Sequence, residues 1–120
     1  MDWLDDSTSF QENTITVWFR AVGVEEFLSL MDTKKFSTRE VSSSMKQFGL
    51  SLEETIKYAD KKINKEYVSI LKITLKVEAL DLQDYEAKPD PFIFKSGTVT
   101  IQKENLEKLN DYILSIEQEV

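Results

Sequence analysis

The stretch over residues 47–60 constrains the fold of this chain more than any other. Ser51 and Glu54 form the S-x-x-E pattern of a capping box, in which the serine accepts a backbone N–H and the glutamate returns to the cap residue. Apolar residues then follow at helical spacing: Leu52, Ile56, Ala59 and Ile63. The chain is therefore predicted to arrive as a short strand, break at Gly49 and start a helix over 52–63.

Four other stretches have the pattern of strands. Apolar and polar residues alternate over 14–22 and 67–77, as expected for strands with different environments on their two faces. Short runs of apolar and β-branched residues over 92–94 and 98–101 predict two more strands. The Ser-Gly pair at 96–97 separates them and predicts a turn or bulge.

Two further helices complete the predicted elements. A short amphipathic helix begins at Val24, with Glu25 and Glu26 in the first turn, where the helix dipole favours acidic residues. A closing helix carries one apolar face: Leu106, Leu109, Ile113 and Ile116. The later strands follow one another with short links, which a parallel doubly wound sheet does not allow. We predict an α+β fold, a mixed or mostly antiparallel sheet with about three helices packed on it.

The composition excludes several classes of site. A chain of 120 residues suits one domain, which we place at 14–120 behind an acidic lead-in over 1–13. The absence of cysteine and histidine excludes disulfides, thiol nucleophiles, histidine triads and the usual zinc sites, and no metal site is predicted. The sequence has neither a run of about 20 apolar residues nor the pattern of a secretory signal. We expect a soluble cytoplasmic protein with no membrane partner.

The formal net charge of −7 bears on the partner. Such a surface repels phosphate backbones, so broad nucleic-acid binding is not expected, whereas a protein with a basic surface would be attracted. Acidic residues are dense over 78–90, where the spacing matches no calcium loop. This segment is either a solvated connection or the contact surface for a protein partner, and its candidate contacts are Glu78, Asp81, Asp84 and Glu86.

Three segments together resemble small ADP-ribosyltransferase-like domains. Residues 17–23 (VWFRAVG) are similar to the first core strand of that family, in which an arginine near the strand end meets the phosphates of NAD. Residues 27–37 (FLSLMDTKKFS) are similar to the helix and tight turn that follow. Residues 48–59 (FGLSLEETIKYA) resemble the second core strand, with its S-T-S-type end, and the next helix. The resemblance implies an ADP-ribosyltransferase-like fold.

The resemblance also implies roles for particular residues. Arg20 matches the phosphate-binding arginine, and a guanidinium suits a pyrophosphate because its donors are planar. Ser51 stands at the last serine of S-T-S and would line the nicotinamide site, although the capping pattern favours a helix cap. The family's catalytic glutamate is expected near 92–97, where this chain has none. Asp90 and Glu104 are the candidate replacements, and the missing glutamate favours a domain without the activity.

Arg20 shares the less apolar face of the first predicted strand with Trp18. It would either bind a phosphate there or pair with a carboxylate of the acidic segment. The function predicted first is a non-catalytic binding protein without a cofactor, acting on a basic protein partner, as inhibitors of host defence carried by phages or toxin immunity proteins do. The alternatives are an active NAD-dependent ADP-ribosyltransferase and a nucleotide-binding or nucleotide-sequestering module.

Overall fold

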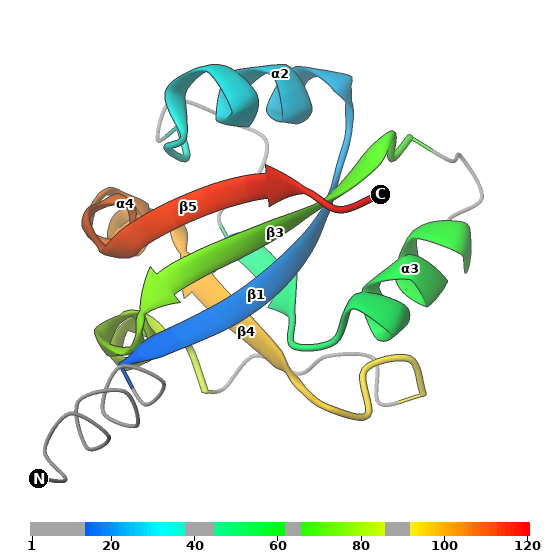
Figure 1. Cartoon of the computed structure of the whole chain (residues 1–120). Helices are drawn as coiled ribbons and strands as arrows, with labels where there is room; N and C mark the ends of the chain where they lie inside the picture. The colour runs from blue at the N-terminus through cyan, green and yellow to red at the C-terminus, as the bar shows by residue number, and fades with distance from the viewer. Residues whose placement is uncertain (1–13, 38–44, 62–65, 86–91) are drawn as a thin grey trace, which may run out of the picture.

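The chain forms a five-stranded antiparallel sheet accompanied by helices, which confirms the predicted α+β class (Figure 1). The computed structural model describes residues 14–37, 45–61, 66–85 and 92–120. The strands are β1 (Ile15–Val22), β2 (Met45–Gly49), β3 (Ser69–Lys76), β4 (Thr98–Gln102) and β5 (Ile113–Gln118). The α-helices are α2 (Val24–Thr33), α3 (Leu52–Lys61) and α4 (Leu106–Tyr112), and the 3-10 helices are η1 (Val77–Leu82) and η2 (Lys103–Asn105). No helix in these ranges is long and apolar enough to cross a bilayer.

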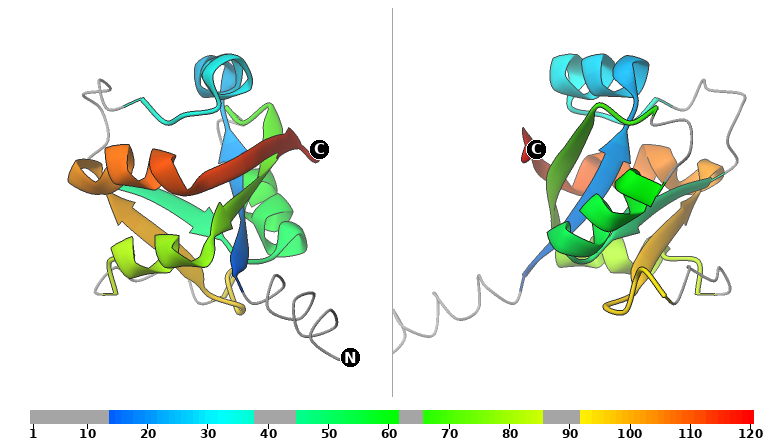
Figure 2. Two further views of the ribbon diagram at one scale, coloured as in Figure 1. Left: turned by 60° about the vertical axis from the view of Figure 1, so that its left-hand side comes forward. Right: turned by 90° about the vertical axis from the view of Figure 1, so that its right-hand side faces the viewer.

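The sheet has the strand order β4-β2-β1-β3-β5 and consists of two parts joined at one point. β1 and β3 pair over eight positions, and β2 and β4 pair over five. Between β1 and β2, in contrast, Phe19 and Gly49 are the only described residues in register. Figures 1 and 2 show β2 and β4 crossing β1 and β3 at a steep angle. The two strands therefore diverge directly beyond Phe19 and Gly49.

The core lies on the face of the sheet that carries Trp18. Trp18 and Val22 are fully buried, and the indole N–H of Trp18 donates to Thr16 Oγ1 at 2.9 Å. The ring of Phe48 packs against Trp18 with a centroid distance of 5.1 Å. The strand predicted over 14–22 is confirmed as β1, but the face with fewer apolar residues, which carries Trp18 and Val22, is the one that enters the main core.

The C-terminal segment corrects the predicted closing helix. α4 ends at Tyr112, and Ile113–Gln118 forms β5, an edge strand paired antiparallel with β3. The side chain of Ile116 is still buried, because it lies opposite Ile73 in the ladder. A β-branched residue favours this extended conformation.

Residues 92–94 correct a second prediction, since they form turns and no strand. Phe92 is 85% exposed while Ile93 is buried, so the apolar cluster divides between surface and interior. The predicted turn at 96–97 is confirmed, and Gly97 has a positive φ of 92°, which a glycine adopts without strain. The predicted acidic lead-in over 1–13 lies outside the described residues.

Candidate functional site

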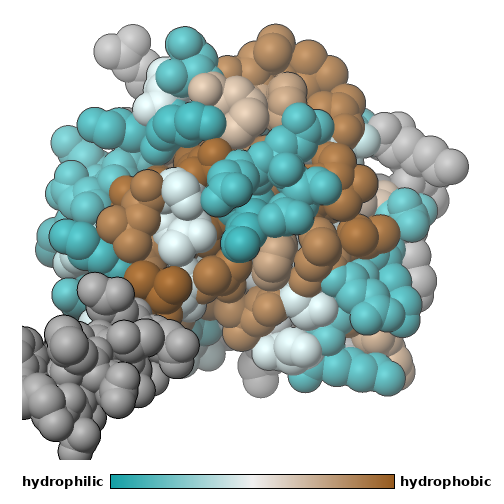
Figure 3. Space-filling view, viewed as in Figure 1, coloured by the Kyte–Doolittle hydropathy of each residue, from teal (hydrophilic) through white to brown (hydrophobic). Residues whose placement is uncertain are grey.

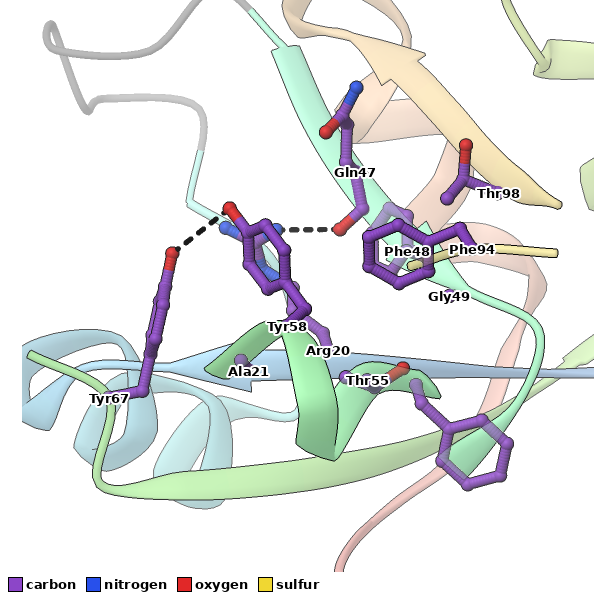
Figure 4. A pocket seen from close by; sticks show the side chains of 11 residues that line it. Arg20, Ala21, Gln47, Phe48, Gly49, Thr55, Tyr58, Tyr67, Phe94 and Thr98 are labelled. Atoms are coloured by element: carbon purple, nitrogen blue, oxygen red, sulfur yellow. Dashed lines mark hydrogen bonds between the residues drawn. The ribbon is translucent and has the colours of Figure 1, made fainter. Parts of the chain in front are cut away.

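A pocket lies where β1 and β2 diverge, beside α3 (Figure 4). It has a volume of about 60 Å³, the space of about four to six waters at 10–15 Å³ a water. Five of its lining side chains are aromatic and come from separate parts of the chain: Phe19, Phe48, Tyr58, Tyr67 and Phe94. The other lining residues are Arg20, Ala21, Gln47, Gly49, Thr55 and Thr98.

Arg20 is held firmly in the wall of this pocket. Its Nε and Nη2 donate to the two carboxylate oxygens of Glu26 at 2.5 and 3.1 Å, and its Nη1 donates to the carbonyl of Gln47 at 2.8 Å. The guanidinium also lies over the ring of Phe48, 5.6 Å from the centroid. Beyond Phe19 and Gly49, β1 and β2 are no longer paired. The carbonyl of Gln47 on β2 therefore accepts a hydrogen bond from the side chain of Arg20 in place of a backbone N–H of β1.

Glu26, in the first turn of α2, is the carboxylate that pairs with Arg20. Burial raises the pKa of Glu26, but hydrogen bonds and charge from Arg20, with the nearby charge of Lys46, outweigh burial and leave the pKa below 4.5. The Nζ of Lys46 lies 3.6 Å from Glu26 Oε1. The carboxylate is thus ionised at neutral pH. The sequence offered an ion pair between Arg20 and the acidic segment as an alternative. This prediction is wrong for residues 78–85, the part of that segment that the structure describes, because Arg20 pairs with Glu26.

Two tyrosines border the pocket on its α3 side. Tyr58, on α3, and Tyr67, just before β3, bring their hydroxyls to 3.3 Å, with ring centroids 5.9 Å apart. Tyr58 also packs on Phe94 at a centroid distance of 5.3 Å. Burial and the contact with Tyr58 raise the pKa of Tyr67 to about 12. The Tyr67 hydroxyl is therefore neutral at physiological pH and can donate a hydrogen bond.

Gly49 is required by a close approach at the floor of the pocket. A Cβ on this residue would lie well within 3.0 Å of Thr55 Oγ1 and 3.2 Å from the ring of Phe94. Thr55 is itself fixed, because its hydroxyl donates to the carbonyl of Ser51 at 2.8 Å. The lack of a side chain at Gly49 thus allows α3 and Phe94 to pack against β2.

Ser51 is a helix cap and does not line the pocket. Its Oγ accepts the backbone N–H of Glu54 at 3.3 Å, as the capping pattern predicts. The second half of the predicted capping box is wrong. The carboxylate of Glu54 instead accepts hydrogen bonds from the backbone N–H and the hydroxyl of Ser96, at 3.1 and 2.7 Å. Glu54 thereby fixes the turn that carries Phe94 to the pocket.

The candidate carboxylates do not meet Arg20 in the part of the chain that the structure describes. Thr98, at the start of β4, lines the pocket, but Glu104 follows the far end of that strand, about 13 Å away at 3.3 Å per residue. Glu104 is exposed, and Asp90 lies outside the described residues. No aspartate or glutamate lines the pocket among the residues described.

The predicted partner contacts are only partly available at the surface. Glu78 and Asp81 lie on η1 and are both exposed, whereas Asp84 is half-buried and accepts a hydrogen bond from Gln102 Nε2 at 2.5 Å. Glu86 lies outside the described residues. Groups of three side chains that could ligate a metal are absent from the described ranges.

The sequence reasoning missed Glu26 as the partner of Arg20, and it missed the convergence of the aromatic residues. The nearest signal was the acidic first turn of α2, six residues beyond Arg20, which the helix dipole alone already explained. Comparison with protein-family models, curated proteins and solved structures finds no match for this chain.

Proposed function

We propose that this protein is a nucleotide-binding module that holds the flat ring of its ligand in the pocket between β1, β2 and α3 and catalyses no group transfer. The observation that carries the proposal is the composition of the pocket wall, which contains five aromatic residues and one guanidinium. Stacking of a base on an aromatic side chain contributes about 1–3 kcal/mol. In this proposal the ring of the ligand lies against the aromatic wall, and the sugar and phosphates remain outside the small pocket.

Arg20 supplies the polar contact in this proposal. Its bonds to Glu26 and Gln47 use three of the five N–H groups, which leaves two without a partner among the described residues. These two can donate to a carbonyl or ring nitrogen of the ligand. This role departs from the phosphate contact that the ADP-ribosyltransferase resemblance implies, because the charge of Arg20 is already paired. The same resemblance makes NAD the first ligand to test.

Binding is expected to raise the melting temperature in a saturable way. The protein is titrated with NAD, nicotinamide mononucleotide and AMP, and a ligand at a hundred times its Kd adds about 2.7 kcal/mol to stability. Phe94→Leu, which removes a ring from the pocket, should weaken binding about tenfold, in line with the energy of one stacking contact. Phe92→Leu is the matched control, because Phe92 is 85% exposed and does not line the pocket.

Two outcomes would overturn the proposal. Absence of a shift with all three ligands, or equal binding by Phe94→Leu and the wild type, would exclude the pocket as the site. Transfer of label from NAD, or NAD loss that Arg20→Lys abolishes, would show the alternative, an active ADP-ribosyltransferase.

The outer face of α2 favours a second candidate, binding to a basic protein. Val24 and Leu28, one turn apart, are 55% and 60% exposed, and Glu25 and Asp32 on the same helix are also exposed. Figure 3 shows apolar residues gathered over this part of the surface. An apolar face with carboxylates beside it suits a partner whose apolar contact is bordered by lysine or arginine.

This candidate predicts a complex that depends on both salt and Leu28. A pull-down with the wild type as bait at about 50 mM salt should capture a partner that is lost near 500 mM, because screening weakens exposed charge pairs. Leu28→Ser should lose the same partner, while Leu114→Ser, the same change at an exposed leucine on β5, should retain it. A complex that persists near 500 mM salt and is also formed by Leu28→Ser would count against this surface.

A further inference from the structure

Glu26 affects the charge that the pocket presents to a ligand, in addition to fixing the side chain of Arg20. It lies outside the pocket lining but forms two hydrogen bonds with the one cation among the described lining residues. The side chains of Arg20 and Glu26 are only 17% and 18% exposed, so solvent screens this pair weakly. A ligand that enters the pocket therefore meets a guanidinium that is paired with the carboxylate of Glu26 at 2.5 Å, and this carboxylate also lies 3.6 Å from Lys46 Nζ.

We infer that Glu26 sets the charge preference of the pocket, so that it selects a ring bearing a neutral carboxamide or carbonyl over the same ring bearing a carboxylate. This inference rests on the proposed function and names the chemical class of the ring. A carboxylate would be attracted to Arg20 but repelled by Glu26 a few ångströms behind it, and it would lose its water without a free cation in return. A neutral amide gives up less water and can still accept from the two remaining N–H groups.

The other groups near the ring are compatible with a neutral ligand. Gln47 and Thr98 are uncharged residues of the pocket lining, and the neutral hydroxyl of Tyr67 can donate a hydrogen bond. Lys46 lies against Glu26 but not in the pocket lining. Glu26 is thus the residue that determines how much of the charge of Arg20 acts on the ligand.

The test uses two ligands that differ in a single group, NAD and its analogue with nicotinic acid in place of nicotinamide. Titration calorimetry on the wild type should show NAD binding at least about tenfold more tightly, on the scale of one partly screened charge contact. Glu26→Gln keeps the size and an acceptor oxygen but removes the charge, so it should abolish or reverse this ratio. Glu25→Gln is the matched control, since Glu25 is the exposed neighbour on the same turn and should leave the ratio unchanged.

A second variant guards against loss of folding. Glu26→Asp keeps the charge near Arg20 and should keep the preference for NAD, even where the protein melts at a lower temperature. If Glu26→Gln binds and still prefers NAD as the wild type does, the inference about Glu26 is overturned while the binding function stands. If neither ligand binds to the wild type or any variant, the proposed function itself fails.

Discussion

Replacing Arg20 with methionine is expected to lower the free energy of unfolding by about 3 kcal/mol. Removing one partner of a buried ion pair costs about 3–5 kcal/mol, and the lower end applies here because each side chain keeps some exposure. The carboxylate of Glu26 would keep its burial and lose two hydrogen bonds, and the carbonyl of Gln47 would lose its donor. Urea denaturation at pH 7 measures the change. Replacing both Arg20 and Glu26 with methionine should cost less than the sum of the two single changes.

The pH dependence separates this charge effect from simple packing. In the wild type the pKa of Glu26 is lowered from 4.5, so its contribution is fully present above about pH 4.5 and is lost as the pH falls through the lower folded value. Without Arg20, only Lys46 opposes the effect of burial, so we expect the pKa of Glu26 to rise and the variant to regain stability when the carboxyl takes up a proton. The deficit of Arg20→Met should therefore shrink between pH 7 and pH 4. An equal deficit at both values would assign the loss to packing alone.

The elements that the sequence predicted well are those specified by neighbours in the chain. The cap at Ser51, the helix behind it and the alternation in β1 depend on contacts within a few residues, and local patterns report such contacts. The segment around Ile113 failed for the complementary reason. Its apolar spacing fits a helix face, but the open edge of β3 offers a ladder of hydrogen bonds that periodicity does not detect.

The candidate site was predictable only in part. Arg20 was identified from its place at the end of a strand, but its partner is six residues further on, a spacing that belongs to neither a helix nor a strand. Gly23, the single residue between β1 and α2, is where the chain changes direction and brings the two side chains together. The pocket itself draws on residues as distant as Phe19 and Phe94. Its position follows from the divergence of β1 and β2, which only the three-dimensional pairing reveals.

Gly49→Ala is expected to destabilise the protein by about 2–3 kcal/mol and to close the pocket. Overpacking a filled core costs about 1–3 kcal/mol, and the upper part of that range applies because the new Cβ would come well within 3.0 Å of Thr55 Oγ1. Thr55 cannot rotate away without breaking its hydrogen bond to Ser51, so α3 would have to move. The ring of Phe94 would also be displaced, and ligand binding at the pocket should fall together with stability. Denaturation and the NAD titration are measured on the same variant.

A second substitution tests whether Thr55 is the cause. Thr55→Ala removes the clashing oxygen and alone should cost about 1 kcal/mol for the lost hydrogen bond. Added to Gly49→Ala, it should restore a large part of the stability, because the new methyl group then has the ring of Phe94, at 3.2 Å, as its closest contact. Gly23→Ala is the control for glycine removal as such, since its Cβ would come only within 3.4 Å of one backbone oxygen, that of Glu66. Losses of similar size at Gly23 and Gly49 would assign the effect to the backbone, and the explanation by close approach of α3 would then be wrong.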